Sequence, residues 1–216
     1  MIDTVLENNN FKFGGQNYIQ TEGTAIGSKL GMHYASTYMG KWEAEVLEKV
    51  HYKPTEYCRF VDDIFGIWLH GEQSLKEFCK VANECHPRIK LTMEYSEEGV
   101  TFLDTRVYLV NGVIETDLYI KPTDRHLYLH SKSDHPSQMK RAIPYGLGIR
   151  LKSICSDDKS YRRNRKALKE HLYKRGYRKS DVEDQLRKVD NLNRDDLLNQ
   201  TQATRSRQER VPLVLT

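Results

Sequence analysis

The chain has 216 residues, of which 38% are hydrophobic and 30% charged, so it can bury a core and still present a large polar surface. We expect neither a membrane span nor a secretory signal, because no apolar run is long enough and the first residues lack a basic segment followed by an apolar block. The charge is uneven: residues 1–120 hold 11 Lys and Arg against 18 Asp and Glu, whereas residues 121–216 hold 23 against 12. A basic second half suits phosphate backbones, but it is also typical of a solvated helical surface.

The first half of the chain shows alternating helix and strand patterns. Glycines punctuate the first thirty residues, which we expect to be rich in loops. A helix is predicted next, because apolar residues recur on one face, at Ala35, Tyr38, Met39, Trp42, Val46 and Val50. Two apolar runs, 57–61 and 64–69, are separated only by Asp62-Asp63, which predicts a tight hairpin.

A second helix is predicted to open at Ser74, with Glu77 completing a capping box. Strand patterns return over residues 89–95, 100–110 and 113–120, and Asn111-Gly112 predicts a hairpin between the last two. Short strands between amphipathic helices favour an α+β fold with an antiparallel sheet up to residue 120.

The second half is predicted to be all-helical. Pro136 could start a helix with its buried face formed by Met139, Ile143, Leu147, Leu151 and Ile154. A basic helix follows over residues 161–174 and ends at Gly176, and a capping box from Ser180 to Glu183 opens a third helix. We therefore predict domains over 1–120 and 121–190, then a polar linker over 191–216 that leads toward a further module and ends in a strand-like apolar segment.

The four cysteines form no CxxC pair and lie within apolar patterns, which indicates a reducing compartment and no zinc site. Three histidines, His126, His130 and His135, have a spacing that matches no metal site well, and solvated loop histidines are the commoner outcome.

The adjacent carboxylates Asp62 and Asp63 are the main candidate site. Two such groups repel one another and resist desolvation, and a divalent cation relieves both problems. The simpler alternative is a polar turn, in which Asp is common. Neighbouring residues of a strand face opposite ways, so a two-metal site needs a carboxylate from another strand. Asp104 and Asp117 are sequence candidates, although both lie in ordinary hairpin contexts.

The segment Arg59-Phe60-Val61-Asp62-Asp63 resembles the palm signature of reverse transcriptases. Residues 20–28 look like the glycine-containing motif that precedes a palm helix in those enzymes, and residues 100–105 look like the primer-grip hairpin. Further motifs, including Lys121-Pro122-Thr123-Asp124 and Ser133-Asp134-His135-Pro136, are similar to Penelope-like retroelements, and the resemblance covers roughly residues 5–190.

The resemblance implies an RNA-directed DNA polymerase fragment, with a partial palm followed by an all-α, thumb-like bundle. It implies that Asp62 and Asp63 bind Mg²⁺ (or Mn²⁺) and act in catalysis. The other implied roles are nucleotide and template binding by Gln20, Gly23 and Gly27, primer grip by Phe102, Leu103 and Asp104, and backbone contact by Arg162, Arg163, Arg165 and Lys166. An RNA template, a DNA primer and a dNTP are the implied partners, and a nuclear, intracellular location is expected.

The same resemblance places the first aspartate-bearing strand upstream of Met1, so we expect the isolated chain to be inactive. The alternative is a catalytically inactive remnant that still binds nucleic acid through its basic half. A helix-turn-helix is a further interpretation of residues 136–190, and a structural protein that binds no nucleic acid is the third class.

Overall fold

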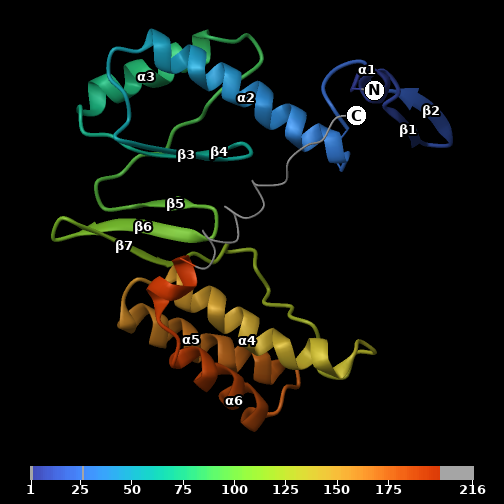
Figure 1. The fold of residues 1–216 in the computed structure, drawn as a ribbon, viewed down its shortest axis with the longest axis vertical. Coiled ribbons are helices and arrows are strands. Elements are labelled where there is room, and N and C mark those ends of the chain that lie inside the picture. The colour runs from blue at the N-terminus through green and yellow to red at the C-terminus, as the bar shows by residue number, and fades with distance from the viewer. Residues whose placement is uncertain (1, 26, 200–216) are drawn as a thin grey trace, which may run out of the picture. The chain divides into compact units, whose positions relative to one another are not determined.

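The computed structural model describes residues 2–25 and 27–199, and it is a mixed α+β fold with small antiparallel sheets (Figure 1). The chain divides into two compact units, Met1–Glu94 and Tyr95–Thr216. The expected boundary at residue 120 therefore lies inside the second unit. None of the helices in the described ranges is long and apolar enough to cross a membrane.

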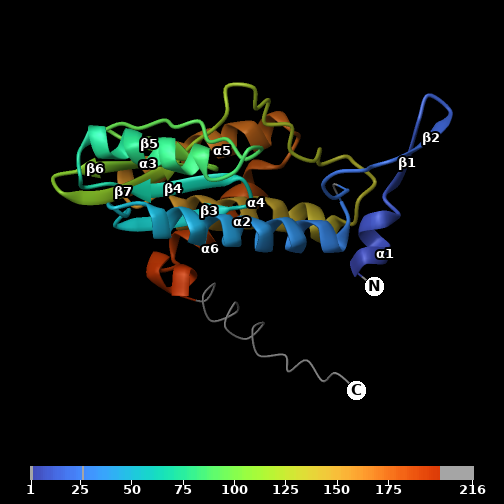
Figure 2. The ribbon, with the colours of Figure 1, turned by 90° about the horizontal axis from the view of Figure 1, so that it is seen from above.

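Over residues 2–25 and 27–94, the first unit contains three helices and two separate hairpins. Its helices are α1 (Ile2–Glu7), α2 (Lys29–Lys49) and α3 (Glu72–Glu84), and its hairpins pair β1 (Asn10–Phe13) with β2 (Gln16–Ile19) and β3 (Glu56–Phe60) with β4 (Asp63–Ile67). Figure 2 shows α2 as one uninterrupted helix. Trp42 and Val46 of α2 pack against Ala82 of α3, and Ile64 of β4 covers this small core. The core thus fixes the β3–β4 hairpin against α2 and α3.

Several sequence expectations for the first unit are wrong at the level of backbone detail. The first thirty residues include α1 and the β1–β2 hairpin, which the glycine pattern did not predict. Helix α3 begins at Glu72 with Gly71 as its N-cap, because the Ser74 hydroxyl donates to the carbonyl oxygens of His70 and Gly71 instead of capping the helix. Residues 89–95 form no strand, since the Asn83 side-chain amide bonds both the N–H and the carbonyl of Leu91.

The second unit combines a three-stranded sheet with a group of packed helices. The strands are β5 (Val100–Phe102), β6 (Thr105–Val110) and β7 (Val113–Leu118), paired in the order β5-β6-β7, and the helices are α4 (Ser137–Ile154), α5 (Asp158–Lys174) and α6 (Lys179–Asp190). Residues 194–199, which were expected to belong to a polar linker, are helical as well. The predicted Asn111-Gly112 hairpin is confirmed: both turn residues have positive φ, of 51° and 79°. Strand β7 also contacts α4 and α5, which is why the sheet belongs to the helical unit.

The helices enclose the main hydrophobic core of the second unit. Leu151 of α4, Leu168 and Leu172 of α5, and Val182 and Leu186 of α6 are buried in it. Met139, which was expected on the buried face of α4, is exposed. The expected capping box at Ser180 does not form, because Ser180 bonds Asp181 and Glu183 pairs with residues of α5. The strand-like segment 212–216 lies outside the described residues.

Candidate functional site

The β3–β4 hairpin carries the two candidate aspartates at its turn. Phe60 pairs with Asp63 across the hairpin, so Val61 and Asp62 form a two-residue turn. Both aspartate side chains belong to exposed residues and form no ion pair within the described part of the chain. The turn is strained, because Val61 has a φ of +57°, which a β-branched residue rarely adopts. The predicted hairpin is therefore confirmed, and it presents two unneutralised carboxylates to solvent.

Arg59 connects this turn to α2. Its Nε donates to Glu43 Oε1 at 2.6 Å, its Nη2 donates to the Ser36 carbonyl at 3.2 Å, and its Nη1 donates to the Val61 carbonyl at 2.9 Å. The side chains of Arg59 and Glu43 are only 12% and 14% exposed. One guanidinium thus fixes the strained turn residue Val61 to Ser36 and Glu43, which lie two turns apart on α2.

Tyr57 also connects the β3–β4 hairpin to Glu43 of α2. Its hydroxyl donates to Glu43 Oε1 at 3.0 Å, so Glu43 accepts from both Tyr57 and Arg59. Burial, followed by the nearby Glu43 carboxylate, raises the pKa of Tyr57 well above its ordinary value, which keeps its hydroxyl protonated as a donor. The sequence pattern did not reveal this cluster, because Glu43 lies in a helix and the other two residues lie in a strand.

The donor set at the hairpin fits a divalent cation only in part. Two exposed carboxylates without basic partners supply the oxygen ligands that Mg²⁺ and Mn²⁺ prefer. Among the residues that the structure describes, no group of three or more His, Cys, Asp or Glu side chains could hold a metal ion. A two-metal site at this turn therefore requires a further carboxylate.

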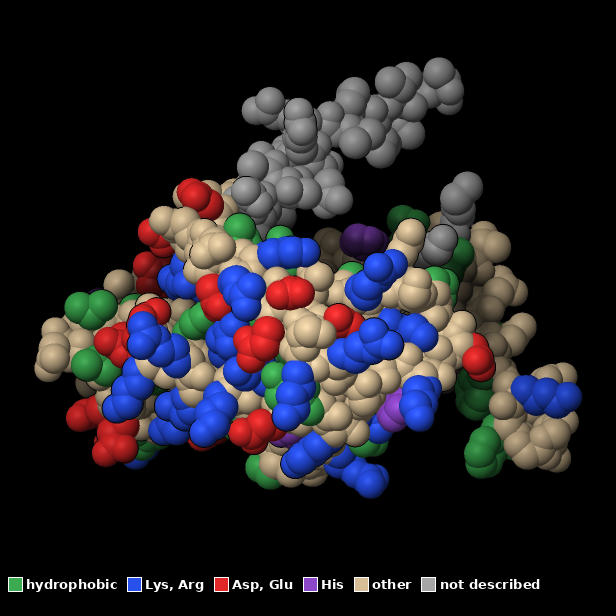
Figure 3. All heavy atoms as spheres, turned by 90° about the horizontal axis from the view of Figure 1, so that it is seen from below, with side chains coloured by type: hydrophobic (Ala, Val, Ile, Leu, Met, Phe, Trp, Pro, Cys, Tyr) green, Lys and Arg blue, Asp and Glu red, His purple; other side chains and the backbone are tan. Residues whose placement is uncertain are grey.

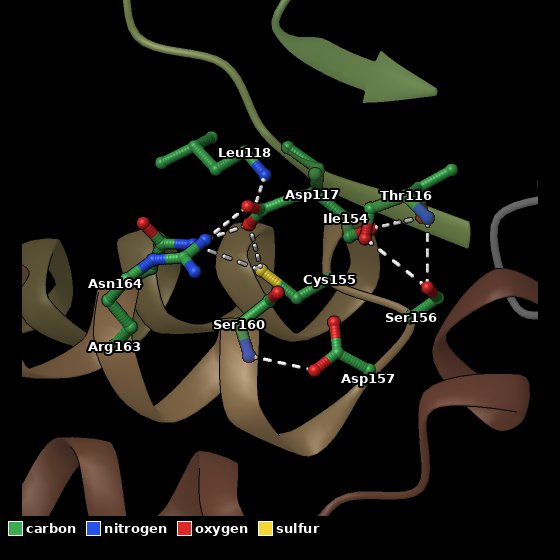
Figure 4. A network of polar contacts seen from close by, with 10 residues as sticks. All are labelled: Thr116, Asp117, Leu118, Ile154, Cys155, Ser156, Asp157, Ser160, Arg163 and Asn164. Atoms are coloured by element: carbon green, nitrogen blue, oxygen red, sulfur yellow. Dashed lines mark hydrogen bonds and ion pairs between the residues drawn. The ribbon is translucent and has the colours of Figure 1, made fainter. Parts of the chain in front are cut away.

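The two carboxylates that the sequence offered as additional ligands have structural partners. Asp104 accepts from Arg150 Nε of α4 at 2.8 Å. Asp117 lies at the centre of the network in Figure 4, where it accepts from the Leu118 N–H at 2.8 Å and from Asn164 Nδ2 at 2.7 Å, and pairs with Arg163. Asp104 and Asp117 thus tie the sheet of the second unit to its helices.

The predicted nucleotide-binding residues occupy a loop between β2 and α2. Gln20 and Gly23 line a cavity of about 410 Å³ together with residues of α1 and Tyr34 of α2, whereas Gly27 does not line it. Gly23 has a φ of +75°, a conformation that favours glycine. Gln20 Nε2 donates to the Glu22 carbonyl at 2.7 Å, which closes the loop on itself. The structure therefore brings two of these three residues together.

The predicted primer-grip residues form the β5–β6 turn. Phe102 ends β5, Leu103 has a φ of +56° and is 38% exposed, and Asp104 reaches Arg150. The turn is bonded further by the Tyr119 N–H, which donates to the Asp104 carbonyl at 2.9 Å. Leu103 and the Asp104 side chain are both partly exposed, and Leu103 is the apolar one of the two.

The predicted backbone-binding residues lie in α5, but most of their charges are paired. Arg163 pairs with Asp117, and Arg165 pairs with Asp190 at 2.9 Å and with Glu183 at 3.3 Å. Arg162 pairs with Asp158 one turn away, although both side chains are at least 70% exposed. Lys166 is exposed and makes no ion pair within the described part of the chain. Arg163 and Arg165 thus link α5 to β7 and α6 through ion pairs, a role that only the tertiary contacts reveal.

The histidines considered as metal ligands take other roles. The His126 ring stacks on His171 of α5, with ring centroids 3.7 Å apart, and burial lowers the pKa of His171. His130 Nδ1 accepts from the Lys132 N–H at 3.1 Å, and His135 is exposed. These contacts attach the segment before α4 to α5.

The comparisons with known proteins add one finding. A family model described as an animal helix-turn-helix domain matches residues 127–187, which span α4, α5 and most of α6. No curated protein and no solved structure matches the chain.

Proposed function

We propose that this chain is the palm-and-thumb part of an RNA-directed DNA polymerase of the Penelope-like kind, which acts on a template–primer with Mg²⁺ or Mn²⁺. The observation that carries the proposal is the β3–β4 hairpin. Its two-residue turn exposes Asp62 beside Asp63, and neither carboxylate is neutralised by a basic side chain in the described ranges. A turn that served only to reverse the chain would not need adjacent charges that repel each other.

Asp62 and Asp63 would hold the metal in this proposal. A bound divalent cation there would supply polarisation of a primer hydroxyl and neutralisation of the leaving pyrophosphate. Arg59 keeps the turn fixed to α2 through the Val61 carbonyl, so the carboxylates are positioned before any ligand arrives. Gln20 and Gly23 line the open, mostly apolar hollow of about 410 Å³ beside α1, and we assign the nucleotide or template to this side.

Two observations support nucleic-acid binding by the second unit. The helix-turn-helix family match covers its helices. Seen from below in Figure 3, on the side where α4, α5 and α6 lie, many Lys and Arg side chains reach the surface, with Asp and Glu side chains between them. Such a surface attracts phosphate backbones and releases counterions when it binds them.

A second candidate function is nucleic-acid binding without catalysis. The observation that favours it is the absence of a third metal-ligating carboxylate at the hairpin among the described residues. Both functions share the partner and differ in whether Asp62 and Asp63 bind a metal.

Paramagnetic broadening by Mn²⁺ tests the catalytic proposal on the chain itself. We expect Mn²⁺ to broaden the amide signals of residues 61–64 and Mg²⁺ to restore them. The double variant Asp62→Asn, Asp63→Asn should lose this broadening. The matched control is Glu97→Gln, Glu98→Gln, which removes another exposed, adjacent pair of carboxylates. Broadening that persists without Asp62 and Asp63, or that is equally strong around residues 97–98, would contradict the metal assignment.

A further inference from the structure

The α5–α6 pair has the connection of a helix-turn-helix. Four residues, 175–178, join the two helices, and Gly176 in this turn has a φ of +79°. A Cβ at position 176 would lie 2.7 Å from Ser131 Oγ, so glycine is required there. In helix-turn-helix proteins the second helix enters the major groove, and its N-terminal residues contact base edges. That arrangement would assign α6 as the helix that reads DNA.

The side chains of α6 do not suit that role. The helix carries four acidic residues, Asp181, Glu183, Asp184 and Asp190, against three basic ones, Lys179, Arg187 and Lys188. Asp181 and Asp184 are exposed in the N-terminal half, where a recognition helix would meet the negatively charged groove. Arg187 is 3.6 Å from Asp184, which offsets part of its own charge. The leading half of α6 thus carries three acidic residues against Lys179, although the N-cap Arg178 is also exposed, so it is less suited to phosphates than a basic face.

The opposite charge lies along the exposed side of α5. Lys159, Lys166 and Lys174 are spaced by seven and eight residues, which places them on one face of a helix. All three are exposed, and none forms an ion pair with another described residue. Arg162 lies beside this row, and its surface pair with Asp158 contributes little stability, so its guanidinium can reorient toward a phosphate.

The row has the length of a backbone-binding surface. Fifteen residues separate Lys159 from Lys174, which corresponds to roughly 22 Å along the helix. Lysine is a compact charge on a flexible stem and suits phosphate contact more than base readout. One acidic residue, Glu170, interrupts the face. The face formed by Lys159, Arg162, Lys166 and Lys174 is called the α5 face below.

From this contrast we infer that the α5 face, and not α6, binds the phosphate backbone of a nucleic-acid duplex, without reading its sequence. The inference rests on the proposed nucleic-acid-binding function and names the surface that performs it. The second unit would then have the connection of a helix-turn-helix without placing its second helix in the groove. The ion pairs from Arg165 and Lys169 of α5 to Glu183 and Asp190 then act as internal cross-links that hold α6 behind α5.

Two triple variants with the same change in net charge test the inference. Lys159→Ala, Lys166→Ala, Lys174→Ala removes three charges from the α5 face, and Lys179→Ala, Arg187→Ala, Lys188→Ala removes three from α6. Binding of the full chain to fluorescein-labelled 20-base-pair RNA/DNA hybrids of two unrelated sequences is measured by anisotropy over a range of KCl concentrations. Circular dichroism melting checks that both variants keep the wild-type fold.

We expect the α5 variant to bind at least tenfold more weakly, with a salt dependence whose slope is shallower by about 2 to 3. The α6 variant should stay within about threefold of wild type, and the two sequences should bind alike. The inference would be overturned if the α6 variant lost as much duplex affinity as the α5 variant or more, or if neither variant lost affinity. A tenfold preference for one of the two sequences would overturn it as well. A wild-type chain that binds no duplex would instead overturn the proposed nucleic-acid-binding function.

Discussion

At the scale of single residues, the most consequential contact in the first unit is the ion pair between Arg59 and Glu43. Both side chains are nearly buried, and the guanidinium also bonds the carbonyls of Ser36 and Val61. Removing one partner leaves the other charge without compensation in a place where water reaches it poorly. The same change frees the strained Val61 turn that carries the aspartates.

Arg59→Gln should therefore lower the free energy of unfolding by about 2 to 4 kcal/mol. The control is Arg162→Gln, which breaks an exposed pair in α5 and should cost less than about 0.5 kcal/mol. Urea titrations followed by circular dichroism and Trp fluorescence measure both values. Equal, small losses from the two variants would show that the buried pair does not stabilise the hairpin.

Glu183 makes the stability of the second unit depend on pH in the acid range. The hydrogen bond from Lys169, followed by the charges of Lys169 and Arg165, lowers the pKa of Glu183 below its ordinary value. Because the folded-state pKa is the lower one, the stability from this carboxylate is present above about pH 4.5 and is lost as the pH falls through the folded-state pKa.

Glu183→Gln should consequently lower the melting temperature near pH 7 and flatten its decline below about pH 4.5. Melting curves between about pH 3 and 7 give both quantities. The Asp181→Asn variant, in which an exposed carboxylate of α6 without an ion pair in the described ranges is removed, is the control and should follow the wild-type curve. An unchanged acid slope in Glu183→Gln would rule out this linkage.

At the scale of elements, the close approach of α4 and α6 determines how the helices of the second unit pack. A Cβ at Gly148 would lie 2.8 Å from Leu186 Cδ2 and 3.1 Å from Val189 Cγ2, and both of those residues are fully buried. Gly146 lies in the same helix, is exposed and has nothing within 4 Å of its Cβ position. Gly148 therefore lies directly against α6, whereas Gly146 has open space around it, although both belong to α4.

Gly148→Leu should destabilise the second unit by at least about 1 to 3 kcal/mol through overpacking. Gly146→Leu should be neutral or stabilising by up to about 1 kcal/mol, because leucine has the higher helix propensity. Chemical unfolding of both variants provides the measurement. Similar effects at the two positions would mean that α4 and α6 do not approach as closely as described.

The elements also show what could be predicted from the sequence. The hairpins at Asp62-Asp63 and Asn111-Gly112 were both predicted because turn residues between apolar runs act locally, and the Asn111-Gly112 turn is confirmed as predicted. The other turn lies one residue earlier than expected, at Val61-Asp62, because Asp63 pairs with Phe60 as the first residue of β4. The strand expected over residues 89–95 does not form, and Asn83, a residue of α3, bonds the backbone N–H and carbonyl of Leu91 at its centre. Both expected capping boxes fail: the Ser74 hydroxyl bonds the nearby carbonyls of His70 and Gly71, and Glu183 pairs with Lys169 of another helix.

At the scale of the whole molecule, the sequence predicted an α+β arrangement and a basic second half, and the α+β class is confirmed. It could not predict which basic residues are available for a ligand. Arg163 and Arg165 belong to the densest basic run, yet their partners Asp117 and Asp190 lie 46 and 25 residues away. The number of basic residues therefore indicates the class of partner. The ion pairs determine which of these residues remain available to bind it.

Primer extension on an RNA template tests catalysis by the β3–β4 hairpin most directly. The assay uses a polypeptide that joins this chain to an upstream strand carrying a further carboxylate, with Mg²⁺ and dNTPs present. Asp62→Ala should abolish extension while duplex binding changes less than about threefold, because a residue that acts only in the chemical step contributes little to binding. Glu97→Gln, Glu98→Gln should extend primers normally. If the Asp62→Ala polypeptide extended primers at the wild-type rate, the hairpin would not be the catalytic site.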